Sequence, residues 1–469
     1  MIIRRLAPGP WHRAVRLGLL GSSIVLASQA GAAAPDDTVV YGLSDLLARA
    51  LQHNPTVEQE RWKIEQASAD LTQARAAHFL PHLRLETVGG LVPDAKGDVF
   101  NPPSDTTGLR GVGPFGQAEL EFVQPLYTFG LLSNMRDAAA AGVKVAEAAR
   151  ADAELKASLE VKELYYGLLL AKELETLASK LSSELKERSE EVDLDDPTLP
   201  LSTGYKLKLA SLELDSRLRG IRNKSQLVHA TLAWRCAIPD GEEWQPQAEH
   251  LVQDSTRVPP LDSLIAIAAV QRPEWRQLNA GISARRSLES AATSAFYPQI
   301  FLAGGWRFGI APDRTDQHNP FVKDDFNFSS LGMFIGMRQS FEWGLLNAKR
   351  NKARAQLLEL KSQERAAAEG IRLDVSRAHA DFVEAEAGLE ASHEGRRLGR
   401  QWISLARDEY EFTEEAQDLK ALVSAFEGFA ETEQAYHQAV YDYNVALARL
   451  ERAVGVAFTS PSSSARRSD

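Results

Sequence analysis

The side chains that most often perform chemistry in proteins are scattered along this chain without the spacing that chemistry requires. The sequence contains no nucleotide-binding loop, no HExxH pair and no GxSxG segment. Because its histidines do not recur at metal-ligand spacing, we expect surface or packing roles for them: His53, His78, His82, His229, His379 and His393. The only cysteine, Cys236, excludes an intramolecular disulfide and is expected to be a small buried apolar residue. The sequence therefore predicts no enzyme, no cofactor and no metal site.

Carboxylates gather where one helical pattern stops and the next begins. Asp195 and Asp196 lie in the segment 193–200, and Asp418 follows the segment 412–416. Acidic residues at a helix end are typical of a solvated turn.

The N-terminus has the pattern of a secretory signal peptide. Basic residues up to Arg16 precede an apolar run at 17–27 and small residues at 30–34, so we predict a signal peptide at 1–33. The formal net charge of -11, with no basic face beyond the first 16 residues, argues against a nucleic-acid partner. The mature chain has no apolar run of 18 residues, so contact with a membrane would have to use strands.

A very long helix is predicted at 346–412. The stretch lacks proline and is rich in residues that favour helices. About 66 residues give a rod of roughly 100 Å, which needs partners along its whole length. Apolar or small residues recur at a spacing close to 3.5 and define a seam for those partners: Leu346, Ala353, Leu357, Leu360, Ala367, Ile371, Val375, Ala378, Phe382, Ala385 and Leu389. An isolated two-stranded coiled coil would show the same seam.

The two halves of the chain follow the same plan. Arg272-Pro273 matches Asn54-Pro55, and Phe296-Tyr297-Pro298 matches Phe79-Leu80-Pro81. Gln339 with Trp343-Gly344 likewise matches Gln124 with Phe129-Gly130. We therefore predict an internal duplication, in which each copy reads helix, strand, loop, strand, long helix, tip and helix. The two shorter helices of each copy are expected to stack end to end beside the long one. The predicted parts are a first repeat at 35–237, a connector at 238–261, a second repeat at 262–456 and a disordered tail at 457–469.

Four segments alternate between apolar and polar residues, as strands with two different faces do. They are 82–92, 115–127, 299–310 and 327–341. The expected outward sets are Leu83, Leu85 and Leu91; Ala118, Leu120 and Phe122; Ile300, Leu302, Trp306 and Phe308; and Leu331, Met333, Ile335 and Met337. A membrane-spanning strand needs about 9–11 such residues. A soluble antiparallel sheet with one face on a core would show the same alternation.

Aromatic residues gather where helices hand over to strands, as in an interfacial girdle. They are Phe79, Tyr127, Phe129, Phe296, Tyr297, Phe341 and Trp343. The helix-to-strand junction itself is expected at Pro81, Pro125, Gly130, Pro298 and Gly344. Four strands cannot close a barrel with a lumen, and open strand edges are not tolerated in lipid. Three subunits sharing about 12 strands is the simplest closed arrangement.

With these features the chain resembles the TolC-like outer-membrane efflux protein family over nearly the whole mature sequence. The resemblance rests on the duplicated plan and on motifs at 79–81, 296–298, 124–126 with 129–130, and 441–450 with Gly455. It implies a mainly helical fold with transmembrane strands. A homotrimer would form a 12-stranded β-barrel in the outer membrane, continued by a periplasmic α-helical barrel with the connector in its equatorial region.

The resemblance further implies a passive exit duct of a tripartite efflux or type I secretion system. Its partners would be a periplasmic adaptor protein, an inner-membrane transporter and outer-membrane lipid. The pump usually selects the substrate, so the sequence does not distinguish drugs, metals and proteins.

The tip is where the sequence departs from the family. Members commonly have a glycine-containing turn before an Asp-rich first helical turn, whereas 412–416 lacks glycine and only Asp418 is retained. The resemblance implies a periplasmic tip or gate at Asp195, Asp196 and Asp418, an acidic mouth that favours cations. A solvated charged turn is the alternative interpretation of these acids. A family member with a drifted tip, dedicated to secretion or metal export, is therefore one alternative. A secreted periplasmic coiled-coil scaffold or adaptor without a membrane barrel is the other.

Overall fold

The computed structural model describes residues 39–94, 111–191, 201–316, 321, 323–413 and 416–458. The first half contains β1 (Val39–Tyr41), α1 (Leu43–His53), α2 (Pro55–Phe79), β2 (His82–Pro93), β3 (Val112–Tyr127), α3 (Leu131–Glu191) and α4 (Leu201–Arg235). The second half contains β4 (Trp244–Pro246), α5 (Leu261–Gln271), α6 (Pro273–Ser294), β5 (Gln299–Ile310), β6 (Phe328–Arg338), α7 (Trp343–Thr413) and α8 (Ala416–Val454). In these ranges, no helix is both long enough and apolar enough to span a membrane.

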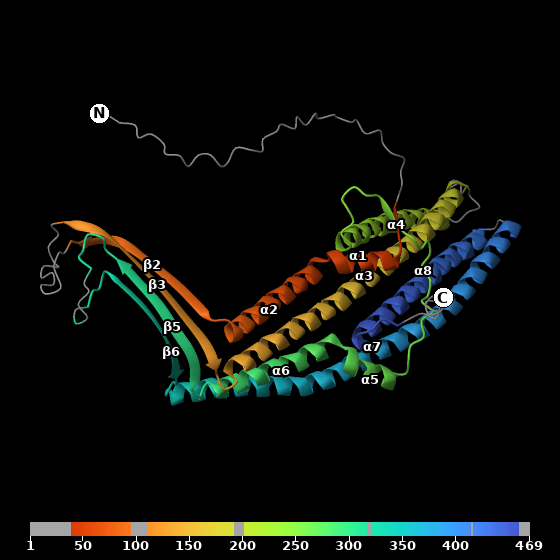
Figure 1. Ribbon diagram of the computed structural model, residues 1–469. Helices are drawn as coiled ribbons and strands as arrows, with labels where there is room; N and C mark the ends of the chain where they lie inside the picture. Colours follow the sequence, from red (N-terminus) through yellow and green to blue (C-terminus); the bar gives the residue numbers. More distant parts are fainter. Residues whose placement is uncertain are drawn as a thin grey trace, which may run out of the picture.

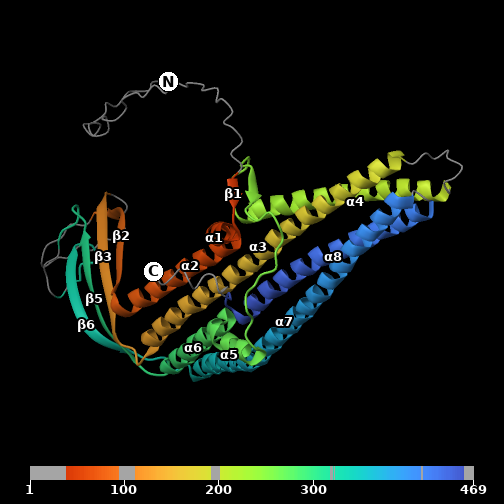
Figure 2. The ribbon, with the colours of Figure 1, turned by 90° about the vertical axis from the view of Figure 1, so that its right-hand side faces the viewer.

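Helices arranged side by side form a long wall, and the sheet continues from one end of it (Figure 1). In the first half, α2 and α4 both pack against α3, while in the second half α6 and α8 both pack against α7. The predicted end-to-end arrangement of short helices beside each long one is therefore confirmed. Since α3 also packs against α6 and α8, the two halves join into one layer, which Figure 2 shows from a second direction.

The seam predicted on the long helix is confirmed. Its larger side chains, including Leu357, Val375 and Phe382, are buried, and its alanines are at least partly buried. They pack against α8 and the α5–α6 pair, so the seam serves a wall of several helices rather than an isolated two-stranded coil. Cys236 lies in the same core with no exposed surface, and burial raises the pKa of its thiol to about 11.

In each half of the chain, the helix that precedes the strands is divided in two at a proline: α1 is separated from α2, and α5 from α6. Because proline has no N–H, it begins a new helix at Pro55 and at Pro273. At the first break the side chain of Asn54, only 2% exposed, accepts a hydrogen bond of 2.9 Å from Thr56 N. At the second, buried Arg272 makes an ion pair of 3.1 Å with Asp374 on α7. These contacts fix the breaks to the neighbouring structure.

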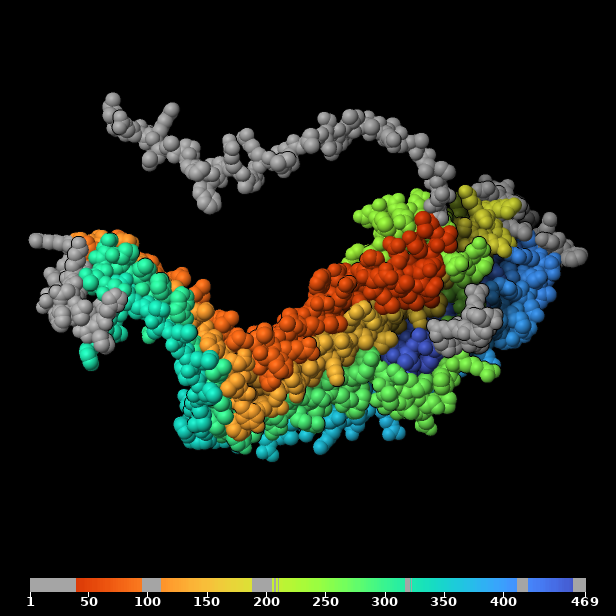
Figure 3. Space-filling model, viewed as in Figure 1, coloured from red at the N-terminus to blue at the C-terminus, as the bar shows by residue number. Residues whose placement is uncertain are grey.

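The sheet has the antiparallel strand order β2-β3-β5-β6 and bends away from the helix wall, as the space-filling view shows (Figure 3). The four strand predictions are confirmed, with shifted ends. β3 begins at Val112 because Val112–Gly116 pair with Gly89–Pro93. β6 ends at Arg338, earlier than predicted. Gln339 instead turns the chain toward α7 and donates through Nε2 to Phe296 O at 3.3 Å.

The connector between the halves crosses α3 and α8 and is fastened to both. Its strand β4 pairs in parallel with β1. Asn444 on α8, only 1% exposed, accepts a hydrogen bond from Asp254 N and donates one to Val252 O, each of 2.9 Å. On α3, Glu173 Oε1 accepts from Leu251 N at 3.1 Å. These side chains satisfy backbone groups that a buried loop would otherwise leave unpaired.

We predict that Asn444→Ala destabilises the protein by about 1–3 kcal/mol, because it removes two hydrogen bonds of a buried side chain and leaves two partly buried backbone groups of the connector without these partners. The free energy of denaturant unfolding measures this cost. Gln438→Ala is the matched control, since among the described residues the Gln438 side chain bonds only to exposed Asp442 on its own helix. Equal stability of the two variants would contradict the anchoring role.

Candidate functional site

The first junction between sheet and helix depends on an unusual backbone. Phe129 (φ 49°) and Gly130 (φ 90°) both adopt left-handed conformations immediately before α3. A Cβ on Gly130 would lie 3.2 Å from Asn134 Nδ2 and 3.3 Å from Ser294 Oγ. Glycine is required here for its conformation and for the close approach of α6.

The second junction does not use its glycine in this way. Gly344 lies in the first turn of α7, and a Cβ there would meet no atom within 4 Å. The other expected junction residues are prolines at strand ends. Pro81 and Pro298 directly precede β2 and β5, and Pro125 lies at the register shift near the end of β3. The sequence match between Gly130 and Gly344 therefore conceals two different backbone conformations.

Aromatic rings cluster around both junctions, as predicted. Tyr297 stacks on Phe129 with ring centroids 5.4 Å apart, and Tyr127 meets Phe129 edge to face at 4.6 Å. At the second junction, Trp343 stacks on Phe296 at 6.0 Å. Most of these side chains remain half exposed, which leaves an aromatic band between the sheet and the helix wall.

The register places the four predicted outward sets on one face of the sheet. One row of paired residues runs across all four strands: Leu85, Leu120, Trp306 and Leu331. The adjacent row on the opposite face is mostly charged: Glu86, Glu119, Arg307 and Ser330. The apolar face is open in the single chain, with Leu331 84% exposed and Met333 69% exposed. Nothing in the described protomer covers it.

Both edges of this sheet lack a partner strand within the described chain. β2 pairs only with β3, and β6 pairs only with β5. Both sides of the helix wall also carry exposed apolar side chains. They are Tyr205, Leu209, Leu212 and Leu227 on α4, and Leu358, Leu373, Leu398 and Leu405 on α7.

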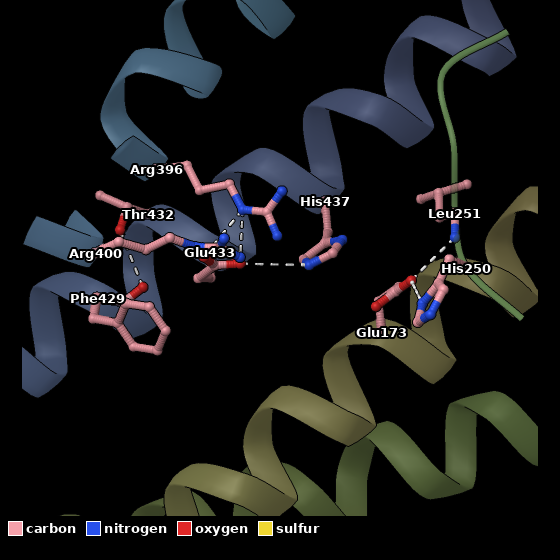
Figure 4. A network of polar contacts seen from close by, with 9 residues as sticks. All are labelled: Glu173, His250, Leu251, Arg396, Arg400, Phe429, Thr432, Glu433 and His437. Atoms are coloured by element: carbon pink, nitrogen blue, oxygen red, sulfur yellow. Dashed lines mark hydrogen bonds and ion pairs between the residues drawn. The ribbon is translucent and has the colours of Figure 1, made fainter. Parts of the chain in front are cut away.

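A buried charge network was not predicted from the sequence. Glu433 on α8, only 3% exposed, accepts hydrogen bonds of 3.0 Å from Arg396 Nε at both carboxylate oxygens and a further one from Arg400 Nε (Figure 4). Burial raises the pKa of Glu433, but the hydrogen bonds from Arg400 and Arg396 outweigh burial and leave that pKa below its usual value. The spacing of Arg396 and Arg400, one helical turn apart, is the signal that could have suggested a shared partner.

The comparisons with known proteins agree with this geometry. The model of the family described as "Outer membrane efflux protein" matches residues 46–189. No curated protein sequence matches the chain. Among solved structures, the Campylobacter jejuni CmeC outer membrane channel is 17% identical, with a TM-score of 0.70 over 90% of this chain and 88% of that one.

The chain has the fold of the TolC-like outer membrane efflux proteins. CusC, at 17% identity, gives a TM-score of 0.72 over 91% of this chain and 96% of that one. The Neisseria gonorrhoeae MtrE outer membrane channel, in its open state, is 19% identical, with a TM-score of 0.70 over 88% of this chain and 89% of that one. The predicted resemblance is confirmed, as is the mainly helical fold with a sheet of strands, whereas the trimer and its closed barrels stay a prediction.

The tip is the predicted site of which the structure describes least. Asp195 and Asp196 lie outside them. Asp418 belongs to the first turn of α8, but its side chain is outside the described part. The gate at these acids therefore stays a prediction.

The two junction glycines offer a matched pair of variants. We predict that Gly130→Ala costs about 1–3 kcal/mol, because its backbone is left-handed and α6 is close. Gly344→Ala is expected to be neutral or to stabilise α7 by up to about 1 kcal/mol, because the position is helical and open. The unfolding free energies of the two variants check the difference, and effects of the same sign and size would contradict it.

Proposed function

We propose that three copies of this chain form a passive exit duct in the outer membrane of a Gram-negative bacterium. The observation that carries this proposal is the four-stranded sheet with one open apolar face and two unpaired edges. In lipid, unpaired backbone groups at a sheet edge cost several kcal/mol each. Pairing β6 of one copy with β2 of the next removes every such edge.

The strand directions favour this closure. The four strands alternate in direction, so β2 and β6 are antiparallel and a β6–β2 pair between subunits continues the pattern. Twelve strands then form a closed barrel of even number. The apolar rows face lipid, and the charged row containing Glu86, Glu119 and Arg307 lines the lumen.

The ends of the helix wall support the same assembly. The exposed apolar residues on α7 of one subunit can pack against those on α4 of the next. Such a contact repeated three times closes the wall into a helical tube below the barrel. The aromatic band at the junctions then lies at the periplasmic surface of the membrane.

As a passive duct, the protein requires a separate source of energy. We propose that a periplasmic adaptor and an inner-membrane transporter supply it and select the exported compound. The lumen acts as a path and performs no reaction, which agrees with the absence of catalytic motifs from the sequence.

The experiment that tests the duct asks whether this protein is a trimer in the outer membrane or a soluble monomer. Outer-membrane fractions from expressing cells should contain a species whose migration on gels changes with heating, and its mass in detergent should equal three chains. A monomer found only in the soluble periplasm would overturn the proposal and favour the coiled-coil scaffold.

We predict that Met333→Arg blocks assembly in the outer membrane, whereas Gly332→Arg does not. Met333 lies at the middle of β6 on the apolar face, where an arginine in lipid costs about 2–4 kcal/mol per chain. Gly332 is on the opposite face, and a side chain there meets no atom within 4 Å. The amount of heat-modifiable trimer in membranes measures both. Equal amounts would show that the apolar face is not in lipid.

The acidic tip yields a second prediction. Asp418→Ala combined with Asp195→Asn and Asp196→Asn should reduce the cation preference of single channels in planar bilayers, because these acids would line the mouth. Asp240→Asn with Glu243→Gln, at exposed positions of the connector, is the control. Unchanged selectivity in the tip variant would assign the three acids to a solvated turn.

A further inference from the structure

A cavity of about 400 Å³ lies where the connector crosses the helix wall, and none of the features above explains it. α3, α7, α8 and the connector all contribute to its lining. The parts of α3, α7 and α8 that line it lie away from the sheet, so a ligand would reach the cavity from water rather than from the membrane (Figure 1).

Cationic side chains exceed carboxylates in this lining. The cations are Lys180, Arg396 and Arg400, and the carboxylates are those of Glu173 and Glu433. Both carboxylates already have partners. Glu433 is held by the two arginines, and Glu173 Oε1 accepts from Leu251 N at 3.1 Å and lies 3.0 Å from His250 Nδ1.

Several donors remain for a ligand. Within the described part of the chain, Lys180 Nζ and the terminal nitrogens of Arg400 donate to no protein acceptor, and both side chains are exposed at the mouth of the cavity. His437, only 8% exposed, has no hydrogen-bond partner at Nδ1, and its Nε2 lies 3.7 Å from Glu433 Oε2. Figure 4 shows His437 between Glu433 and the Glu173–His250 pair. A buried polar atom without a partner is costly unless something binds it.

We propose that this cavity binds a tetrahedral oxyanion of the sulfate or phosphate class. Such an ion presents several acceptor oxygens at once, which matches donors that come from three helices, and arginine is well suited to bind it. The bound ion would link Lys180 on α3, Arg400 on α7 and His437 on α8. It would therefore hold the three helices together beneath the connector.

Protonation of His437 is expected to accompany binding. Burial lowers the pKa of His437, Glu173 and Glu433 oppose that shift, and Arg396 and Arg400 add to it. The imidazole is thus neutral near pH 7. His250 from the connector and Tyr436 on its own helix complete its surroundings. An anion beside Nδ1 favours the imidazolium, so binding should take up a proton and tighten as the pH falls.

The test is calorimetric titration of the full-length detergent-purified protein with sodium sulfate at constant ionic strength. We expect saturable binding that Lys180→Gln or Arg400→Gln weakens at least about tenfold, because each removes a charged donor. Arg397→Gln is the matched control, since Arg397 lies on the same helix, pairs with exposed Glu394 and does not line the cavity. Sulfate also stabilises proteins in general, but that effect is the same in every variant.

Two outcomes would overturn the proposal. One is the same sulfate response in the wild type, Lys180→Gln and Arg400→Gln, and the other is an equal loss in Arg397→Gln. If Arg400→Gln fails to fold because Glu433 loses a partner, Lys180→Gln still decides, since its ammonium group bonds no protein acceptor. Titrations in two buffers of different ionisation enthalpy measure proton uptake, which should disappear in His437→Gln. The test does not depend on channel activity, so its result is separate from that of the proposed duct.

Discussion

Backbone N–H and C=O groups at the edge of a sheet must find partners wherever water is absent. In this chain, four strands alternate in direction and leave β2 and β6 with one unpaired edge each. Their apolar residues are in register on a single open face. Exposure of the apolar face to water is unfavourable. Exposure of the unpaired backbone groups at the edges to lipid is unfavourable too. The proposed pairing with other copies would satisfy both conditions.

The helix wall, like the sheet, has two uncovered sides. α3 and α7 extend through the wall without interruption, and shorter helices fill the space beside them in pairs. Prolines 55 and 273 end one helix and start the next, so the short helices can follow the layer without straining a continuous backbone. The outer sides of α4 and α7 stay apolar and exposed. The wall and the sheet thus each have two sides that the rest of the described chain leaves uncovered.

Polar groups inside the wall secure its position. Asn444 fastens the connector to α8, Arg272 fastens the α5–α6 break to α7, and Glu433 joins α8 to two arginines of α7. Each of these side chains is almost fully buried, so each must be fully paired to avoid a large penalty. Around His437 and Lys180 the pairing is incomplete, which is why that junction differs from the others.

The order of helices and strands could be predicted from the sequence, because it depends on local periodicity. Alternation at 299–310 gives a strand in any context with one apolar side, and the seam from Leu346 to Leu389 gives a helix that needs neighbours. Matching motifs at the two halves also predicted the resemblance to outer membrane efflux proteins, and the fold agrees with it.

Only the tertiary structure decided the features that depend on contacts between distant segments. Gly130 and Gly344 occupy matching motifs, yet only the first is left-handed and lies close to the end of α6, whereas the second is part of a helix. Glu433 looks like an ordinary surface acid in the sequence, and its burial follows from how α7 packs on α8 around Arg396 and Arg400. The periodicity of the sequence shows which side of a helix or strand is apolar. Which residues pack against that side depends on contacts between segments that lie far apart in the sequence.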